Sequence, residues 1–319
     1  MKDYVKILNT DFINHQTPSQ TVKDPLIVNA GIKLIIKRED LNHQSLSGNK
    51  WHKLKYNLIS AKEGELDTLL TFGGAYSNHI YAVAAAGKLF GFKTIGIIRG
   101  EEHLPLNPAL KFVNSAGMKL FYIDRTTYRE KNSAEFLNYL KEKFGKFYLI
   151  PEGGTNQLAV KGMGEFISNL DGNYDYTCCA CGTGGTLAGI IKGLNGKARA
   201  LGFAVLKGGH FLVDEVERLI NYNSEIAYSN WKINTDYHFG GYAKIKPELI
   251  NFVERFERIN KIPVEPVYTG KLFYGIYDLI QKGYFKSGET ILAIHTGALQ
   301  GLEGMKDRIA KLKKVSINK

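Results

Sequence analysis

Short apolar runs rich in β-forming residues alternate along the chain with longer amphipathic runs, and this alternation predicts βα units around parallel sheets. The predicted strands cover residues 32–40, 67–74, 93–100, 118–124, 147–154, 174–182, 198–208 and 289–297. The predicted helices cover residues 77–91, 107–117, 133–145, 185–194, 210–220, 246–260 and 271–283, and 301–312 closes the chain. Because the elements fall into two consecutive series, we expect two open sheets with a cleft between them.

The charge of the chain changes this picture little. The 319 residues include 42 Lys and Arg against 31 Asp and Glu, a formal net charge of +11. The lysines are spread through every amphipathic segment, and no RNP, zinc-finger or helix-turn-helix signature accompanies them. A solvated basic face is therefore predicted, and no nucleic-acid partner is expected.

The cellular location and the role of the cysteines are inferred from features that the sequence lacks. No run reaches the roughly 18 apolar residues of a membrane span, and the N-terminal stretch lacks the apolar core of a signal peptide. We therefore expect a cytoplasmic protein with no membrane partner. Cys178, Cys179 and Cys181 crowd too closely for an ordinary disulfide and lack a second pair of metal ligands. They are expected to fill a buried strand, and no metal site is predicted.

Chemistry is expected in the glycine-rich turns, because open α/β sheets bind ligands at the carboxyl ends of their strands. The turn "CGTGGT" at 181–186 follows an apolar strand and opens a helix, so its backbone N–H groups and the helix dipole favour an anion such as phosphate. The spacing matches neither a P-loop nor a dinucleotide fingerprint. A tight turn without a ligand is the alternative.

Three further turns carry polar side chains. In "GGAYSNH", Ser77 is predicted to cap a helix, and its hydroxyl with the N–H groups of Asn78 and His79 would suit a carboxylate. In "HTGA", Thr296 stands at the end of a predicted strand. Tyr268 in "VEPVYTGK" precedes a helix, where a packing role is the plain alternative.

Lys50, in "SGNKWHKLK", is the residue that points to a single ligand for these turns. A lysine that loses its proton attacks an aldehyde and forms an imine. A phosphate cradle, a carboxylate site and such a lysine together suit pyridoxal phosphate. His52, Lys53 and Lys55 are expected to be surface residues of the helix that follows Lys50.

Together the motifs resemble the fold-type II pyridoxal-phosphate enzymes, and among them the D-cysteine desulfhydrases and the 1-aminocyclopropane-1-carboxylate (ACC) deaminases. "SGNKWHKLK", "GGAYSNH", "PEGGTN", "CGTGGTLAG", "EPVYTGK" and "HTGA" follow one another in the family's order over nearly the whole chain. The resemblance implies an α/β fold of two three-layer α/β/α domains with open twisted sheets. Residues 1–50 plus 151–319 would form the large cofactor-binding domain, with the smaller domain inserted at 51–150. It also implies a homodimer.

The resemblance assigns roles to individual residues. Lys50 matches the lysine that links to the cofactor and removes the α-proton. Asn78 matches the residue bonded to the ring hydroxyl of the cofactor, Ser77 the carboxylate site, and Tyr268 the tyrosine facing the substrate. The phosphate loop corresponds to Gly182, Thr183, Gly184, Gly185 and Thr186.

Two positions select the desulfhydrase among the family's activities. ACC deaminases usually carry Glu after the tyrosine and Leu after the strand-end histidine, and this chain has Thr269 and Thr296. A threonine hydroxyl near the pyridine nitrogen makes a weaker electron sink than a carboxylate, which suits a good leaving group such as a thiolate. Thr296 is therefore expected at the cofactor, and Thr269 with Tyr268 at the substrate.

The predicted reaction is β-elimination from D-cysteine to pyruvate, ammonia and hydrogen sulfide. The alternatives are deamination of ACC to 2-oxobutyrate, deamination of another small D-amino acid, and a cofactor-binding protein without turnover. The chain also departs from the family pattern at four positions: Tyr76, Tyr81, His52 and Ala298. The two tyrosines are expected to alter the wall of the cleft and the preferred substrate side chain.

Overall fold

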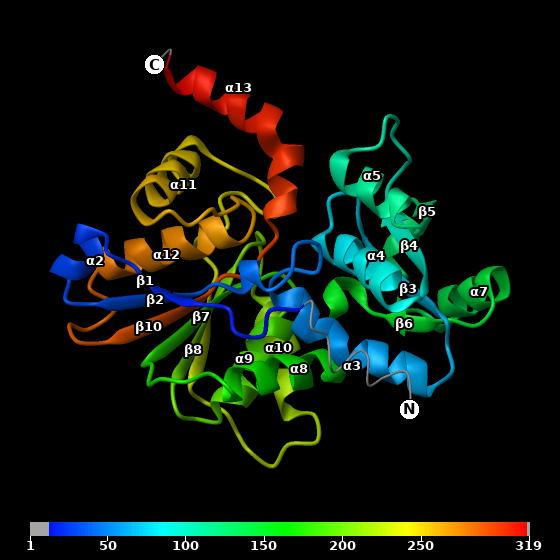
Figure 1. Cartoon of the computed structure of the whole chain (residues 1–319), viewed down its shortest axis with the longest axis horizontal. Helices are drawn as coiled ribbons and strands as arrows, with labels where there is room; N and C mark the ends of the chain where they lie inside the picture. Colours follow the sequence, from blue (N-terminus) through cyan, green and yellow to red (C-terminus); the bar gives the residue numbers. More distant parts are fainter. Residues whose placement is uncertain (1–12, 318–319) are drawn as a thin grey trace.

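The computed structural model describes residues 13–317. Most of the N-terminal stretch in which no signal peptide is predicted lies outside these residues. Two sheets organise the chain (Figure 1). In spatial order, the large sheet consists of β1 (Ser19–Thr21), β2 (Lys33–Lys37), β10 (Thr290–Ile294), β7 (Tyr176–Cys181), β8 (Arg199–Ala204) and β9 (Trp231–Asn234). The small sheet consists of β5 (Lys119–Ile123), β4 (Lys93–Arg99), β3 (Thr68–Gly74) and β6 (Tyr148–Ile150).

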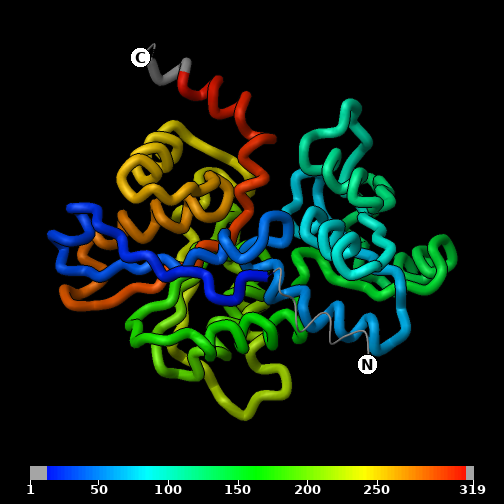
Figure 2. The backbone as a smooth tube through the Cα atoms, in the orientation of Figure 1, coloured from blue at the N-terminus to red at the C-terminus, as the bar shows by residue number. Residues whose placement is uncertain are grey.

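All neighbouring strands run parallel except the edge strand β1, which pairs antiparallel with β2. β2 and β10 lie side by side although they come from opposite ends of the chain, as the blue and orange segments show (Figure 2). The large sheet is therefore built from both ends of the sequence. The small sheet falls entirely within residues 68–150. The proposed domain limits, 1–50 plus 151–319 and 51–150, stay a prediction.

Helices cover both faces of each sheet (Figure 1). On the large sheet, α2 (Pro25–Asn29), α11 (Pro247–Asn260) and α12 (Thr269–Gln281) cover one face, and α8 (Gln157–Ser168), α9 (Gly185–Leu194) and α10 (Phe211–Asn221) the other. On the small sheet, α3 (Asn49–Glu63), α4 (Asn78–Phe90) and α5 (Pro108–Ser115) lie opposite α6 (Arg125–Arg129) and α7 (Ala134–Phe144). The remaining elements are η1 (Glu39–Leu41), η2 (Glu152–Gly154), η3 (Leu299–Met305) and α13 (Lys306–Ile317).

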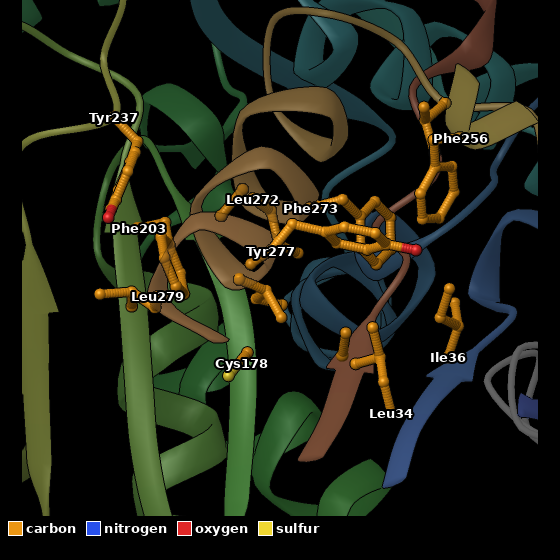
Figure 3. Packing of buried hydrophobic residues seen from close by; sticks show 14 of the residues in the cluster. Leu34, Ile36, Cys178, Phe203, Tyr237, Phe256, Leu272, Phe273, Tyr277 and Leu279 are labelled. Atoms are coloured by element: carbon orange, nitrogen blue, oxygen red, sulfur yellow. The ribbon is translucent and has the colours of Figure 1, made fainter. Parts of the chain in front are cut away.

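The largest core lies between the large sheet and helices α11 and α12 (Figure 3). Leu34, Ile36 and Cys178 of the strands are fully buried there against aromatic rings from the helices. The rings of Phe256 and Phe273 stack with their centroids 4.7 Å apart. Burial of such side chains stabilises the fold by roughly 1.5–3 kcal/mol each.

The predicted α/β class is confirmed, and so are the predicted strands within a few residues. All three cysteines lie buried in β7, as expected. The short strands β1 and β9 and the helix α8 were not predicted. None of the helices within residues 13–317 is long and apolar enough to cross a membrane.

Candidate active site

Lys50 stands at the start of α3, held there by a close approach of two backbones. Gly48 precedes the helix with φ of +71° and packs on the end of β10. A Cβ at Gly48 would lie 1.9 Å from the carbonyl oxygen of Thr296, so only glycine fits this position. The motif "SGNK" therefore brings the start of α3 against Thr296, the residue that follows the strand-end His295.

A short hydrogen-bond chain joins Lys50 to the predicted phosphate loop. Its Nζ donates to Asn49 Oδ1 at 2.6 Å, and Asn49 Nδ2 donates to Thr186 Oγ1 at 2.7 Å. Burial lowers the pKa of Lys50 to about 8, although the carboxylate of Glu265 opposes that shift. The amine of Lys50 is thus partly neutral near pH 8, the state in which it is a nucleophile.

Lys53 was expected on the surface, and this expectation is wrong. Its side chain is 3% exposed, and its Nζ donates to the carbonyl of Gly153 and to Thr155 Oγ1. Burial and the nearby charge of Lys50 lower the pKa of Lys53 to about 7. The spacing of three residues from Lys50 puts both amines on one face of α3.

His52 and Lys55 are not solvated surface residues either, because α3 packs against α8. The side chain of His52 is 12% exposed and lies 2.6 Å from Glu39 Oε2, and its ring stacks on Phe166. Lys55 is 13% exposed and pairs with Glu165 at 2.8 Å. Residues far along the chain therefore cover the helix that the local pattern predicted to be open.

The loop from Gly182 to Thr186 forms the tight strand-to-helix turn that the glycines predicted. Gly184 has φ of +77° and precedes α9, so the first N–H groups of this helix lack acceptors within it. Thr183 shares a hydrogen bond with Thr155, and Thr155 in turn receives one from Lys53. Helix N–H groups, two hydroxyls and a buried ammonium thus converge, and this donor set fits a phosphate.

On the small-sheet side, Ser77 caps α4 as predicted. Its Oγ accepts from the N–H of His79 at 3.2 Å and of Ile80 at 3.3 Å. The N–H of His79 is therefore engaged by the cap and not open, which differs from the expected carboxylate site. The ring of His79 is buried and bonds to Thr71. The N–H of Asn78 at the first helical position needs an acceptor from outside the helix.

Tyr268 lies over the phosphate loop and meets a second tyrosine. A Cβ on Gly182 would be 3.3 Å from its ring, and its hydroxyl donates to that of Tyr242 at 3.1 Å. Burial raises the pKa of Tyr268, and the phenol of Tyr242 adds to the shift. Sequence reasoning missed Tyr242, whose only local signal is the preceding glycine pair in "HFGGY".

Thr269 and Thr296 are both buried. The backbone of Thr296 lies against Gly48, just before α3, whereas Thr269 is the first residue of α12. Thr269 is fully buried, and its hydroxyl bonds to Glu265, whose carboxylate also accepts from the N–H groups of Val267, Tyr268 and Thr269. Burial raises the pKa of Glu265 to about 7. Thr269 thus belongs to the cap of α12, and its role at the substrate stays a prediction.

The comparisons with known proteins fit this geometry. The model of the pyridoxal-phosphate-dependent enzyme family matches residues 14–297, most of the chain. Because this match spans more than half of the chain, the chain belongs to the pyridoxal-phosphate-dependent enzymes. Its cofactor is pyridoxal 5′-phosphate.

Named relatives narrow the group. A Pyrococcus furiosus protein provisionally named ACC deaminase is 34% identical over 95% of this chain and 96% of its own length. The mitochondrial bifunctional D-cysteine desulfhydrase/ACC deaminase of Arabidopsis thaliana is 33% identical over 88% of this chain and 76% of its own length. A crystal structure of an ACC deaminase homologue superposes with a TM-score of 0.83 at 30% identity, covering 98% of this chain and 99% of that one. The predicted family, fold-type II enzymes of the ACC deaminase and D-cysteine desulfhydrase group, is confirmed.

The lowered pKa of Lys50 predicts how the apoprotein captures its cofactor. Only the neutral amine attacks an aldehyde, so the capture rate is expected to rise with pH, to reach half its maximum near pH 8 and to level off above about pH 9. Stopped-flow absorbance after mixing apoprotein with pyridoxal phosphate measures this, with Lys53→Met as a control because Lys53 titrates nearby. A rate that keeps rising toward the ordinary lysine pKa of 10.5 would contradict the assignment.

Lys53 is expected to contribute to cofactor affinity without forming the covalent link. Lys53→Met removes a cation beside the phosphate loop, and a charge-assisted hydrogen bond is worth about 1.5–3 kcal/mol. We expect cofactor binding to weaken by about 10- to 100-fold, measured by titrating apoprotein with pyridoxal phosphate. Lys55→Met on the same helix is the matched control and should leave the affinity unchanged. Equal affinity of wild type and Lys53→Met would remove Lys53 from the phosphate site.

Proposed function

We propose that this enzyme is a D-cysteine desulfhydrase, which converts D-cysteine and water to pyruvate, ammonia and hydrogen sulfide. The observation that carries the choice of substrate is the pair of threonines, Thr269 and Thr296, at positions where ACC deaminases usually have Glu and Leu. Neither side chain puts a carboxylate on the cofactor ring. A weak electron sink favours elimination of a thiolate over opening of a cyclopropane ring.

The residues divide the work as follows. Lys53, Thr183 and the N–H groups at the start of α9 would hold the phosphate, and Lys50 would bind the aldehyde carbon. Bound pyridoxal phosphate supplies an electron sink for the pair of electrons left by the α-proton. Asn78 and Ser77 orient the cofactor and the substrate carboxylate.

Lys50 is also the base of the proposed reaction. Its neutral Nζ would accept the α-proton of the substrate, and its pKa of about 8 suits a group that takes and returns a proton near neutral pH. Tyr268 faces the substrate side chain, and its hydroxyl, which donates to Tyr242 in this structure, would turn to the departing sulfur to donate its proton there. Both phenols keep their protons at neutral pH, as tyrosines ordinarily do, and desolvation raises the pKa of each further.

The test is the identity of the products. With D-cysteine, the loaded enzyme is expected to release pyruvate and sulfide in equal amounts, and with ACC it should form 2-oxobutyrate far more slowly. Turnover of ACC at the rate of D-cysteine would overturn the choice of substrate. A yellow protein whose spectrum does not change on adding amino acids would mean a cofactor-binding protein without turnover.

ACC deamination is the second candidate, since the Arabidopsis relative carries both activities in its name. The same residues would serve this reaction, with Lys50 again binding the aldehyde carbon.

We also propose that the enzyme works as a homodimer in the cytoplasm, with residues 51–150 as a smaller domain. Light scattering of the loaded enzyme measures the proposed dimer directly.

A further inference from the structure

The turn η3 of the large-sheet side touches the start of α4 on the small-sheet side. Gln300 Nε2 donates to Asn78 Oδ1 at 3.3 Å. Four residues later, a Cβ on Gly304 would lie 2.7 Å from the ring of Tyr76. Because η3 follows β10 and α4 follows β3, these contacts bridge the two sheets at the candidate active site.

The bond to Gln300 fixes which end of the Asn78 carboxamide faces the site. A carboxamide has one acceptor oxygen and one donor nitrogen, so the end not facing Gln300 is the donor. Within residues 13–317, Asn78 Nδ2 donates to no protein group, whereas its Oδ1 is occupied. The nitrogen of Asn78 is therefore an open donor.

An open donor is what an ionised ring hydroxyl needs, because a hydrogen bond to the charged form lowers the pKa of the oxygen that accepts it. The opposite orientation of the amide would place a carbonyl oxygen against that anionic oxygen. We propose that Gln300 is a positioning residue that holds Asn78 with its nitrogen toward the cofactor hydroxyl. This inference rests on the assignment of Asn78 in the proposed function.

Gln300 is suited to this task by its place in the chain. It lies four residues beyond Thr296, and the intervening Ala298 is buried and has φ of +73°, at the start of η3. The strand end that reaches the cofactor and the residue that orients Asn78 are therefore parts of one short segment. The family glycine replaced by Ala298 lies within it.

The spectrum of the bound cofactor tests the inference apart from turnover. Gln300→Leu removes the donor to Asn78, so the cofactor oxygen loses an oriented partner. The absorbance of the bound cofactor changes with pH, and the apparent pKa of this change should rise by about 0.3–1 pH unit. Gln300→Glu offers only acceptor oxygens, draws the Asn78 nitrogen away from the cofactor, and should raise that pKa further than Gln300→Leu. Glu303→Gln, exposed in the same turn, is the matched control and should give the wild-type spectrum.

A double variant separates orientation from a merely structural role. Gln300→Leu combined with Asn78→Ala should shift the pKa no further than Asn78→Ala alone, because Gln300 acts only through Asn78. If Asn78→Ala shifts the transition and Gln300→Leu does not, Gln300 is no positioning residue although the role of Asn78 stands. If neither variant shifts it, the assignment of Asn78 fails and this inference fails with it.

Discussion

Replacing Lys50 by alanine is expected to abolish release of pyruvate and sulfide from D-cysteine, and to remove the absorbance of covalently held cofactor. In the proposed mechanism Lys50 carries two roles, the covalent link and the base. Loss of a positioned base alone slows a reaction by about 10²–10⁴-fold, and loss of the link adds to it. Both effects are read from one preparation, by product assay and by absorbance.

Lys55→Ala is the matched control for this experiment. Lys55 lies on the same helix but pairs with Glu165, away from the phosphate loop. Its variant should keep the cofactor and nearly all activity. If Lys50→Ala kept a rate within about tenfold of the wild type, another group would be the base and the proposed mechanism would be wrong.

Lys271→Met is expected to cause the largest loss of stability. Lys271 is fully buried in α12, and its Nζ donates to the carbonyls of Val205, His238 and Gly241 at 3.2, 2.8 and 2.8 Å. Methionine fills the space but leaves three buried acceptors unpaired, each costing about 1–3 kcal/mol, while the charge no longer has to be desolvated. We expect the free energy of unfolding to fall by about 3–5 kcal/mol in urea titrations.

The same substitution should also reduce activity, because the loop held by Lys271 carries Tyr242, the partner of Tyr268. Lys282→Met at the end of the same helix is the control. That lysine is exposed and pairs with Asp278 at 2.6 Å, so its loss should change stability by less than about 1 kcal/mol. A Lys271→Met protein as stable as the wild type would show that the three carbonyls find other donors.

The sequence predicted the strands and the turns well because each depends on local chemistry. The run at 176–181 is apolar except for Thr177 and is bounded by Asp175 and Gly182, so its burial in a parallel sheet follows from composition. Gly184 and Ser77 mark helix starts by residue type alone. Such signals operate within a few residues of one another.

The residues whose surroundings the sequence did not predict are placed by contacts between distant parts of the chain. The buried amine of Lys53 donates to Gly153 and Thr155, about one hundred residues later, and no local sequence pattern indicates these contacts. Its spacing from Lys50 was the one usable hint. Tyr242 sits in an irregular loop whose shape is held by Lys271 from another helix. Its place at the active site follows only from the folded chain.

The central claim is that Lys50, of the two lysines with a lowered pKa on one face of α3, forms the covalent link to the cofactor. Reduction of the loaded enzyme with borohydride makes that link permanent, and peptide mapping by mass spectrometry then locates it. The structure predicts a single phosphopyridoxyl group on Lys50, with Lys53 unmodified. A phosphopyridoxyl group on Lys53, or on any lysine other than Lys50, would contradict the account.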